Sequence, residues 1–467
     1  MPKRLCLHFL LILVLVALGS VASAAEITDV ADAADTIIIG DTERPDPFDL
    51  YMGVAFRMHL SNGKITREPL VRQGLSSDGC EEGNSRDCLP VDEAEWERGV
   101  NVLDIKSQIG IFHDLAAVLN FHYVLGDTTA LKYAKGVTPD TSSIDPKTGD
   151  ANDSLFVLGE TFDDGFRSKH TGWGNIDEFG YRTGGMDFGL KWAALSDERD
   201  ESKPMWQLSF IWSNPWLADA FSFSKRASED KPGSVGDGVH YLTFGTALSK
   251  RIGNFGLIGI DPNENRRGYI DPYMEFTYTL PVPSAQAPKA LTRSYEDFGR
   301  KPPHRAELNA GMEIVAVEDL KNSRKVAIDL GIRTAFYSEG RSYGLLSDAL
   351  GEMTYVEQAF GVRGLLGLYI QAAEFLRFQA GLSFGYMNEH FVTYEEVGSD
   401  ENGDNQVLPP DSDLNTEKDV INPYFCHNSS GDVCSEKNLP SYDQVGFRFK
   451  DEQHVVFSWF ASLIFTF

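Results

Sequence analysis

The sequence predicts an all-β protein, namely a transmembrane antiparallel β-barrel of about twelve strands with short periplasmic turns and long extracellular loops. Segments in which apolar and polar residues alternate recur along the chain, as in strands with one apolar face. The connections between these segments alternate between short and long, which is the layout of a transmembrane barrel. No run of about 20 apolar residues lies inside the chain, which excludes membrane-spanning helices.

The chain begins with the features of a secretory signal peptide over residues 1–24. Lys3 and Arg4 supply positive charge, Phe9 to Leu18 is an unbroken apolar core, and Ala22-Ser23-Ala24 is a small-residue cleavage site. This apolar core is too short to span a bilayer. We therefore expect the segment to be removed on export.

Residues 25–47 are acidic, and we expect them to form a linker or a short plug before the barrel, which covers residues 48–467. Length alone would suggest about three domains, but the alternating pattern runs through the whole of that range.

The chain carries 42 basic and 69 acidic residues, so loss of Lys3 and Arg4 with the signal leaves 40 against 69, a net charge of −29. This balance excludes nucleic acid as a partner, because phosphates need a basic surface.

The first strand is expected from Leu50 to Leu60, where the alternation is strict over 11 residues. An even number of strands returns both ends of the barrel to the periplasmic side. The connection from Ile252 to Tyr269 is longer than periplasmic turns usually are and is the weakest point of the strand count. The eleven later strands are expected at Leu103–Ile111, Leu115–Leu125, Met186–Trp192, Trp206–Trp212, Leu242–Leu248, Met274–Leu280, Leu308–Ile314, Val326–Phe336, Val356–Leu368, Leu376–Tyr386 and Val455–Phe467.

The last strand carries a family resemblance. Apolar residues stand at alternate positions before a terminal aromatic, at Phe457, Trp459, Leu463, Phe465 and Phe467. This ending resembles the assembly signal of Gram-negative outer-membrane barrels, which implies an outer-membrane location. The same resemblance implies the barrel-assembly machinery, outer-membrane lipids and lipopolysaccharide as partners. The turn from Gly110 to Leu115 is similar to that of uncharacterised barrels from myxobacteria-like organisms, which implies nothing about activity.

Charged residues alternate with the apolar rows and are expected to point into the barrel. Six cations and seven anions nearly cancel, and we interpret them as the lining of a hydrated pore for passive passage of small polar or cationic solutes. The alternative is a closed structural or surface-recognition barrel in which opposite charges pair across strands, as Arg57 and Asp104 would. The expected lumen-lining residues are Arg57, Asp104, Lys106, Asp187, Lys191, Glu275, Glu307, Glu313, Asp329, Arg333, Glu357, Arg363 and Arg377.

The segment His59-Leu60-Ser61-Asn62-Gly63 resembles the His-x-Ser-Asn motif of outer-membrane phospholipase A and of the lipid A deacylases, which are barrel enzymes. The resemblance implies a lipid hydrolase in which His59 activates Ser61 as the nucleophile and Asp104 orients the histidine. In those families the pair faces lipid, whereas the alternation here points both side chains inward. We therefore expect no enzymatic activity, and the hydrolase remains the alternative.

The four cysteines of the mature chain form two pairs of equal spacing, Cys80 with Cys88 and Cys426 with Cys434. An even number of cysteines in an exported protein favours disulfides over metal thiolates. Three connectivities are open, of which we expect the local one.

One acidic loop has the alternating oxygen ligands of a calcium loop, at Asp411, Asp413, Asn415 and Glu417. A threonine stands where that motif needs glycine, so we expect weak Ca²⁺ or Mg²⁺ association at most. The histidines lack metal-ligand spacing, and we expect no other metal site and no cofactor.

Overall fold

The computed structural model describes residues 50–67, 91–112, 114–137, 166–196, 202–220, 227, 231–252, 266–284, 302–319, 322–350, 353–393 and 448–466. Over these ranges, no helix is long and apolar enough to cross a membrane. The expected signal peptide and the acidic segment that follows it lie outside the described residues.

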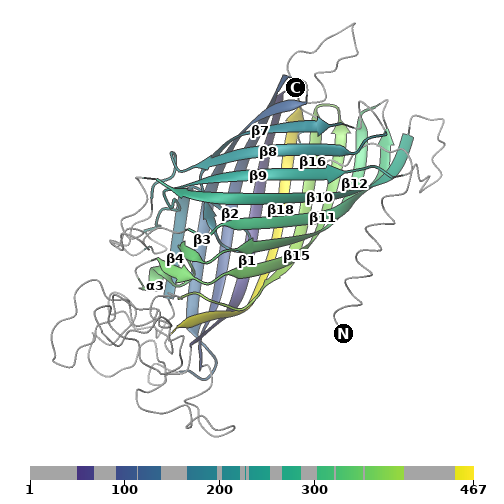
Figure 1. Cartoon of the computed structure of the whole chain (residues 1–467). Helices are drawn as coiled ribbons and strands as arrows, with labels where there is room; N and C mark the ends of the chain where they lie inside the picture. Colours follow the sequence, from purple (N-terminus) through teal and green to yellow (C-terminus); the bar gives the residue numbers. More distant parts are fainter. Residues whose placement is uncertain are drawn as a thin grey trace, which may run out of the picture.

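Twelve antiparallel strands form a barrel wall, which closes because the first strand pairs with the last (Figure 1). The predicted class and the predicted count of twelve strands are therefore confirmed. In order, the wall consists of β1 (Leu50–Arg67), β2 (Val91–Phe112), β3 (Leu115–Tyr133), β7 (Met186–Leu195), β8 (Met205–Asn214), β9 (Val239–Ser249), β10 (Arg266–Pro283), β11 (Arg305–Asp319), β12 (Arg324–Tyr337), β15 (Ala359–Ala373), β16 (Leu376–Met387) and β18 (Phe449–Thr466).

Shorter elements complete the described structure, and none of them is expected from the alternating pattern. β4 pairs with β3, β17 pairs with β18, and two small antiparallel hairpins lie apart from the wall. Their bounds are β4 (Phe166–Trp173), β5 (Asn175–Ile176) paired with β6 (Arg182–Thr183), β13 (Gly340–Ser342) paired with β14 (Thr354–Val356), α3 (Ser347–Leu350) and β17 (His390–Phe391).

The two ends of the barrel differ in their connections. β2 passes to β3 through residues 113–114, and β15 passes to β16 through residues 374–375. The start of β1 and the end of β18 lie at this same end, where Tyr51 is paired with Thr466. Short turns and both ends of the barrel mark the periplasmic side in this class, so the opposite end is extracellular.

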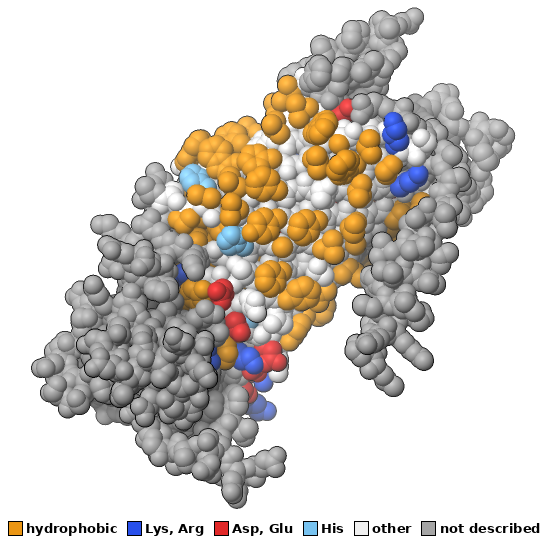
Figure 2. Space-filling view, viewed as in Figure 1, with side chains coloured by type: hydrophobic (Ala, Val, Ile, Leu, Met, Phe, Trp, Pro, Cys, Tyr) orange, Lys and Arg blue, Asp and Glu red, His pale blue; other side chains and the backbone are white. Residues whose placement is uncertain are grey.

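The outer and inner faces of the wall differ in polarity. Along β1, Met52 and Val54 are exposed on the outside, whereas Tyr51 and Ala55 point inward and are buried. Figure 2 shows the same apolar covering over the wall between the two ends, with charged side chains gathered near the ends. Such a band would be unfavourable in water, at about 25 cal/mol per Å² of apolar surface, and it suits the hydrocarbon of a bilayer.

An apolar core lies inside the extracellular end of the barrel. Residues 340–350 and 353–356, which we call the lid, contain β13, α3 and β14 and pack against the extracellular ends of the strands. The lid contributes Leu346, Ala349 and Leu350, and the strands contribute Ile65, Ala94, Trp96, Leu131, Phe166 and Phe449.

Candidate functional site

The fourth strand of the wall is interrupted by an insert that enters the lumen. β4 and β7 lie one after the other along β3, with Trp173 opposite Tyr123 and Met186 opposite Phe121. Residues 174–185, which we call the lumen hairpin, leave the wall between these two halves. The backbone of His122 binds both sides of the neck, accepting from Gly174 N at 3.1 Å and donating to Gly185 O at 2.9 Å. The wall therefore stays closed behind the hairpin.

The tip of the lumen hairpin is a tight turn built around Asp177. Its carboxylate accepts from the backbone nitrogens of Phe179 at 3.0 Å and Tyr181 at 2.8 Å. Gly180 N donates to Asp177 O at 3.1 Å, and Gly180 has a φ of 91°, where a side chain would be strained. This local geometry fixes Asp177 and Glu178 at the tip of the hairpin.

Five arginines from five different strands surround the hairpin, and we call them the arginine collar. Arg57 donates to Asn175 Oδ1 at 2.7 Å, and Arg98 donates to Gly180 O at 3.1 Å. The other three face the two carboxylates of the tip, with Arg305 2.9 Å from Asp177, Arg363 2.6 Å from Glu178 and Arg333 3.9 Å from Glu178. The collar therefore holds the hairpin across the lumen from several sides.

Apolar contacts seat the hairpin between the arginines. Ile176 is fully buried and packs with Val100, Val102, Val124 and Val235. Phe179 packs with Ala335, Tyr337, Ala359, Met387 and Val456. Gly361 makes room for it, because a Cβ there would lie 2.4 Å from the Phe179 ring.

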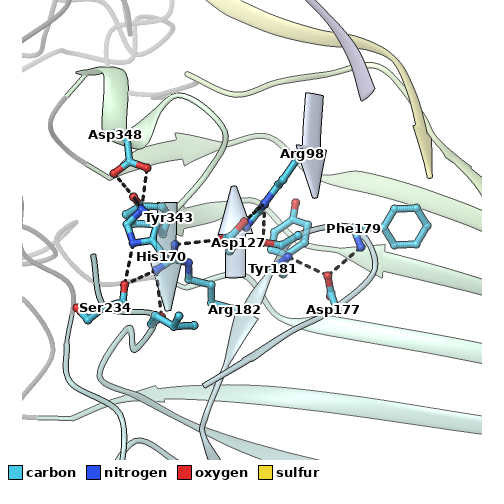
Figure 3. Close-up of polar contacts among 12 residues, drawn as sticks. Arg98, Asp127, His170, Asp177, Phe179, Tyr181, Arg182, Ser234, Tyr343 and Asp348 are labelled. Atoms are coloured by element: carbon cyan, nitrogen blue, oxygen red, sulfur yellow. Dashed lines mark hydrogen bonds and ion pairs between the residues drawn. The ribbon is translucent and has the colours of Figure 1, made fainter. Parts of the chain in front are cut away.

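Polar contacts join the hairpin to the lid (Figure 3). Asp127 on β3 binds Arg98 in a bidentate pair at 2.7 and 2.9 Å and Arg182 of the hairpin at 3.3 Å. The Arg182 guanidinium stacks 3.7 Å from the ring centre of Tyr343 in the lid. The lid and the hairpin are therefore in direct contact through Arg182 and Tyr343.

The same chain of contacts continues to α3. The Tyr343 hydroxyl contacts both His170 Nε2, at 2.8 Å, and Asp348, and His170 Nε2 lies 2.9 Å from the second Asp348 oxygen. Burial opposes ionisation of Asp348, but the hydrogen bonds from His170 and Tyr343 outweigh it and lower the pKa of this carboxyl below its ordinary value. Asp348 is thus held as an anion at the lid end of the network.

Two pockets flank the contact between hairpin and lid. Both are lined by Tyr181 from the hairpin and by Ser342 and Tyr343 from the lid. The first lies toward β9–β12 and has about 530 Å³ of empty space, part of it continuous with solvent. The second, of about 470 Å³, lies toward β1, β2 and β18. The second pocket also touches the hairpin tip, through Phe179 and Gly180.

The structure places the predicted lumen residues in different settings. Arg57 binds Asp104 at 2.5 Å, and Asp187 lies 2.8 Å from His122. Glu313 binds Lys325 at 2.9 Å, Asp329 accepts from Tyr273, and Glu307 binds Arg305. Arg333 and Arg363 belong to the collar. Lys106, Lys191 and Glu275 lie on the wall strands β2, β7 and β10, and Arg377 lies 6.0 Å from the ring centre of Tyr51.

Glu357 differs from the expectation. It stands between β14 and β15 rather than within a wall strand, and its carboxylate accepts from Phe391 N at 3.0 Å. The predicted strand began at Val356, which belongs instead to the lid and is buried. The alternation of apolar and polar residues continues from β14 of the lid into β15 of the wall. A prediction from this alternation alone therefore places Glu357 in the lumen.

The motif residues His59 and Ser61 both point inward, but the expected catalytic contacts are replaced by others. His59 Nδ1 contacts Ser458 Oγ on β18 at 2.8 Å. Asp104 is bound by Arg57 and by His122 Nδ1, the latter at 2.6 Å. Ser61 lines the second pocket. The hydrolase remains a prediction without support from this geometry.

Several predicted sites fall outside the described residues. These are Cys80, Cys88, Cys426 and Cys434, the acidic loop residues Asp411, Asp413, Asn415 and Glu417, and the terminal Phe467. Of the assembly residues within the described range, Phe457, Trp459 and Leu463 are exposed on the outer face of β18. No group of three metal-ligating side chains is found in the part of the chain that the structure describes.

Comparisons with known proteins add little. No family model and no curated protein matches the sequence. Among solved structures, the chain is similar to outer membrane protease OmpT from Escherichia coli, at 7 % identity and a TM-score of 0.26 over 90 % of this chain and 98 % of that one. It is also similar to a Pseudomonas aeruginosa FadL homologue, at 8 % identity and a TM-score of 0.29 over 93 % of this chain and 92 % of that one. A third similar structure is the TodX monoaromatic hydrocarbon channel, at 11 % identity and a TM-score of 0.28 over 96 % of this chain and 97 % of that one.

Likeness at these identities and TM-scores is too remote to carry an argument about activity. Features of the protein itself indicate its structural class. The wall is closed, its outside is an apolar band, and both ends of the barrel lie at the short-turn end. This chain is therefore a closed, membrane-spanning β-barrel of the outer-membrane type.

Proposed function

We propose that this protein is a gated outer-membrane channel for small polar solutes, with the lumen hairpin as its gate. The observation that carries the proposal is the arginine collar, because it binds an insert that enters the lumen through a single neck. The wall is complete without the insert, so its occupation of the lumen needs another reason. Closure of a pore is such a reason.

The hairpin has the properties of a part that moves. Its polar anchors are ion pairs and hydrogen bonds, which water and a passing solute can replace one by one. Gly174 at the neck has a φ of 152°, a backbone conformation that glycine adopts more readily than other residues. Hinges of this kind absorb the backbone change when a loop opens.

The positive charge of the arginine collar indicates which solutes the channel would prefer. The sequence predicts small polar or cationic solutes from a lumen lining in which six cations and seven anions nearly cancel. The groups that a solute would meet behind the hairpin are guanidiniums, which favour anions. We therefore propose polar solutes and expect anions to be preferred over cations.

Gly361→Val tests the gate from the wall side. The new side chain overlaps the Phe179 ring and pushes the hairpin from its seat, because a Cβ alone comes within 2.4 Å. Overpacking costs about 1–3 kcal/mol, so we expect the open fraction in planar-bilayer recordings to rise about tenfold or more.

Gly364→Val, on the same strand, is the matched control. A Cβ at Gly364 meets nothing within 4 Å, so this variant should conduct as the wild type does. Equal open fractions for the two variants, both folded and heat-modifiable, would count against the hairpin as a gate.

A further inference from the structure

The His170 ring on β4 joins three parts of the extracellular end (Figure 3). Its Nδ1 lies 2.9 Å from Ser234 O, and its Nε2 lies 2.9 Å from Asp348 Oδ2 and 2.8 Å from the Tyr343 hydroxyl. The side chain is 4 % exposed, so these contacts are shielded from water. His170 therefore links β4, which continues into the lumen hairpin, to the segment around Ser234 and to the lid.

Both nitrogens of this ring face atoms that can only accept a hydrogen bond. A backbone carbonyl accepts, and so does the Asp348 carboxylate. The Tyr343 hydroxyl donates to the other oxygen of that carboxylate, so its single hydrogen is already used. The contacts of His170 therefore require a hydrogen on each ring nitrogen, and only the imidazolium has both.

Loss of one proton disrupts this arrangement whichever nitrogen loses it. A neutral ring with its hydrogen on Nδ1 turns a lone pair toward Asp348, and one with its hydrogen on Nε2 turns a lone pair toward Ser234 O. If the Tyr343 hydroxyl donates to the ring instead, Asp348 loses that donor. Each neutral form therefore leaves a buried acceptor without its donor, which is unfavourable.

The charged groups around His170 come from the lid, the neighbouring strands and the hairpin. Asp127 stands opposite His170 in the register of β3 and β4, and it is bound by Arg98 of β2 and Arg182 of the hairpin. Among the described residues, the cation in contact with Asp348 is His170 itself, at 2.9 Å. The charge of His170 thus bears most directly on the contact with α3.

We propose that His170 is a latch operated by a proton, whose imidazolium fastens the lid to β4 and whose neutral form releases it. Because the Tyr343 ring also stacks against Arg182 of the hairpin, release of the lid weakens a contact of the gate itself. The lid is then held in acidic surroundings and loosened in alkaline ones, as in other histidine switches. This inference rests on the proposed function only where release of the lid opens the channel.

Hydrogen exchange of the full chain in detergent, followed by mass spectrometry at about pH 5 and about pH 8, tests the latch. The amide of Leu350, which donates to Leu346 O at 2.8 Å, reports on α3. After correction for the intrinsic effect of pH on exchange, we expect the protection of α3 to be about tenfold lower at the higher pH, because a buried acceptor loses its donor. Amides of β12 serve as the control for general loosening of the wall.

Two substitutions remove the titration in different ways. His170→Gln has no group that gains a proton, and Asp348→Asn places an amide that both donates and accepts opposite the ring. Either variant should show equal lid protection at the two pH values, so the test stands if one of them does not fold. His304→Gln, at a histidine that contacts Tyr278 on β10, should keep the wild-type dependence.

Two buried carboxyls near the latch also titrate and must be separated from it. Burial raises the pKa of Asp237, which interacts with Arg182, to about 6, and it also raises the pKa of Asp177 at the hairpin tip. Because burial opposes their charge, ionisation of either carboxyl would loosen the closed state as the pH rises, in the same direction as the latch. Asp237→Asn and Asp177→Asn should nevertheless keep the pH dependence of the lid if His170 is its cause.

The proposal is overturned if wild-type lid protection is equal at both pH values. It is also overturned if the dependence survives undiminished in His170→Gln, which would assign it to the carboxyls. Conductance is a separate readout. A lid that loosens with pH, in a chain whose Gly361→Val variant gives no openings, would support the latch and refute the channel.

Discussion

Deletion of residues 175–185 is expected to convert a closed barrel into one that conducts steadily. The deletion leaves Gly174 as the single residue opposite His122, between Trp173 opposite Tyr123 and Met186 opposite Phe121. β4 then continues into β7 in register, so the variant restores an uninterrupted wall strand. Nothing in the wall has to shift to accommodate the loss.

The expected size of the effect follows from the anchoring of the hairpin. Minor conformers of two-state elements are populated at about 0.1–10 %, and at about 1 %, within that range, the wild type would be closed nearly all of the time. Without the hairpin the open state has no competitor, and the open fraction in planar bilayers should rise about 100-fold. Heat-modifiable, folded protein that gives no steps would show that something other than the hairpin closes the lumen.

Ion selectivity of the deletion variant gives a second readout. Loss of the hairpin removes Asp177 and Glu178 and leaves the five collar arginines on the wall. The wall acids bound to them are Asp104, Asp127 and Glu307, so cations outnumber anions. Reversal potentials in a KCl gradient should indicate anion preference, weaker at high salt because of screening. Cation preference would refute the inferred role of the collar and favour the cationic solutes expected from the sequence.

The wall could be predicted from the sequence because each strand carries its own evidence. In β1, apolar and polar residues alternate with the period of the pleat, so both the strand and its outward face follow from local order. Pairing partners are less well determined. The sequence suggests that β1 and β2 pair near Leu60 and Asn101, whereas Leu60 lies opposite Gly99. That shift of two residues keeps every side chain on its predicted face.

The lumen hairpin could not be predicted in the same way, because its contacts are remote in sequence. Arg57 and Asn175 are 118 residues apart, and Arg305 and Asp177 are 128 apart. Arg98 and Arg305 are missing from the expected lumen residues for a different reason, since the predicted strands begin at Leu103 and Leu308 whereas β2 begins at Val91 and β11 at Arg305. The available signal was a cluster of glycines from Gly172 to Gly185 just before a predicted strand, which is unusual enough to indicate an irregular segment.

Glu178→Ala is expected to open the channel without shortening the chain. Glu178 and Arg363 form a pair in which both side chains are 8 % exposed, at 2.6 Å, and Arg333 lies 3.9 Å from the same carboxylate. While the hairpin stays docked, loss of the Glu178 carboxylate leaves the guanidiniums of Arg363 and Arg333 buried without this counter-charge. In the open state they are hydrated instead, so the substitution destabilises the closed state selectively.

Loss of one partner of a buried ion pair costs about 3–5 kcal/mol. At about 1.4 kcal/mol per factor of ten, even the lower figure shifts the closed–open ratio more than about 100-fold. Single-channel recordings should therefore show frequent openings in Glu178→Ala. Glu178→Gln keeps one hydrogen bond to Arg363, so its open fraction should lie between those of Glu178→Ala and the wild type.

Glu313→Ala separates gating from stability. Glu313 and Lys325 also form a buried pair, at 2.9 Å with side chains 8 % and 4 % exposed, but this pair bridges the wall strands β11 and β12. Both alanine variants should lower the urea midpoint of unfolding by similar amounts, because both leave a buried cation behind. Only Glu178→Ala should raise the open fraction. If Glu313→Ala opens the channel equally, the conductance reports a loosened barrel, and the hairpin is a fixed structural plug instead of a gate.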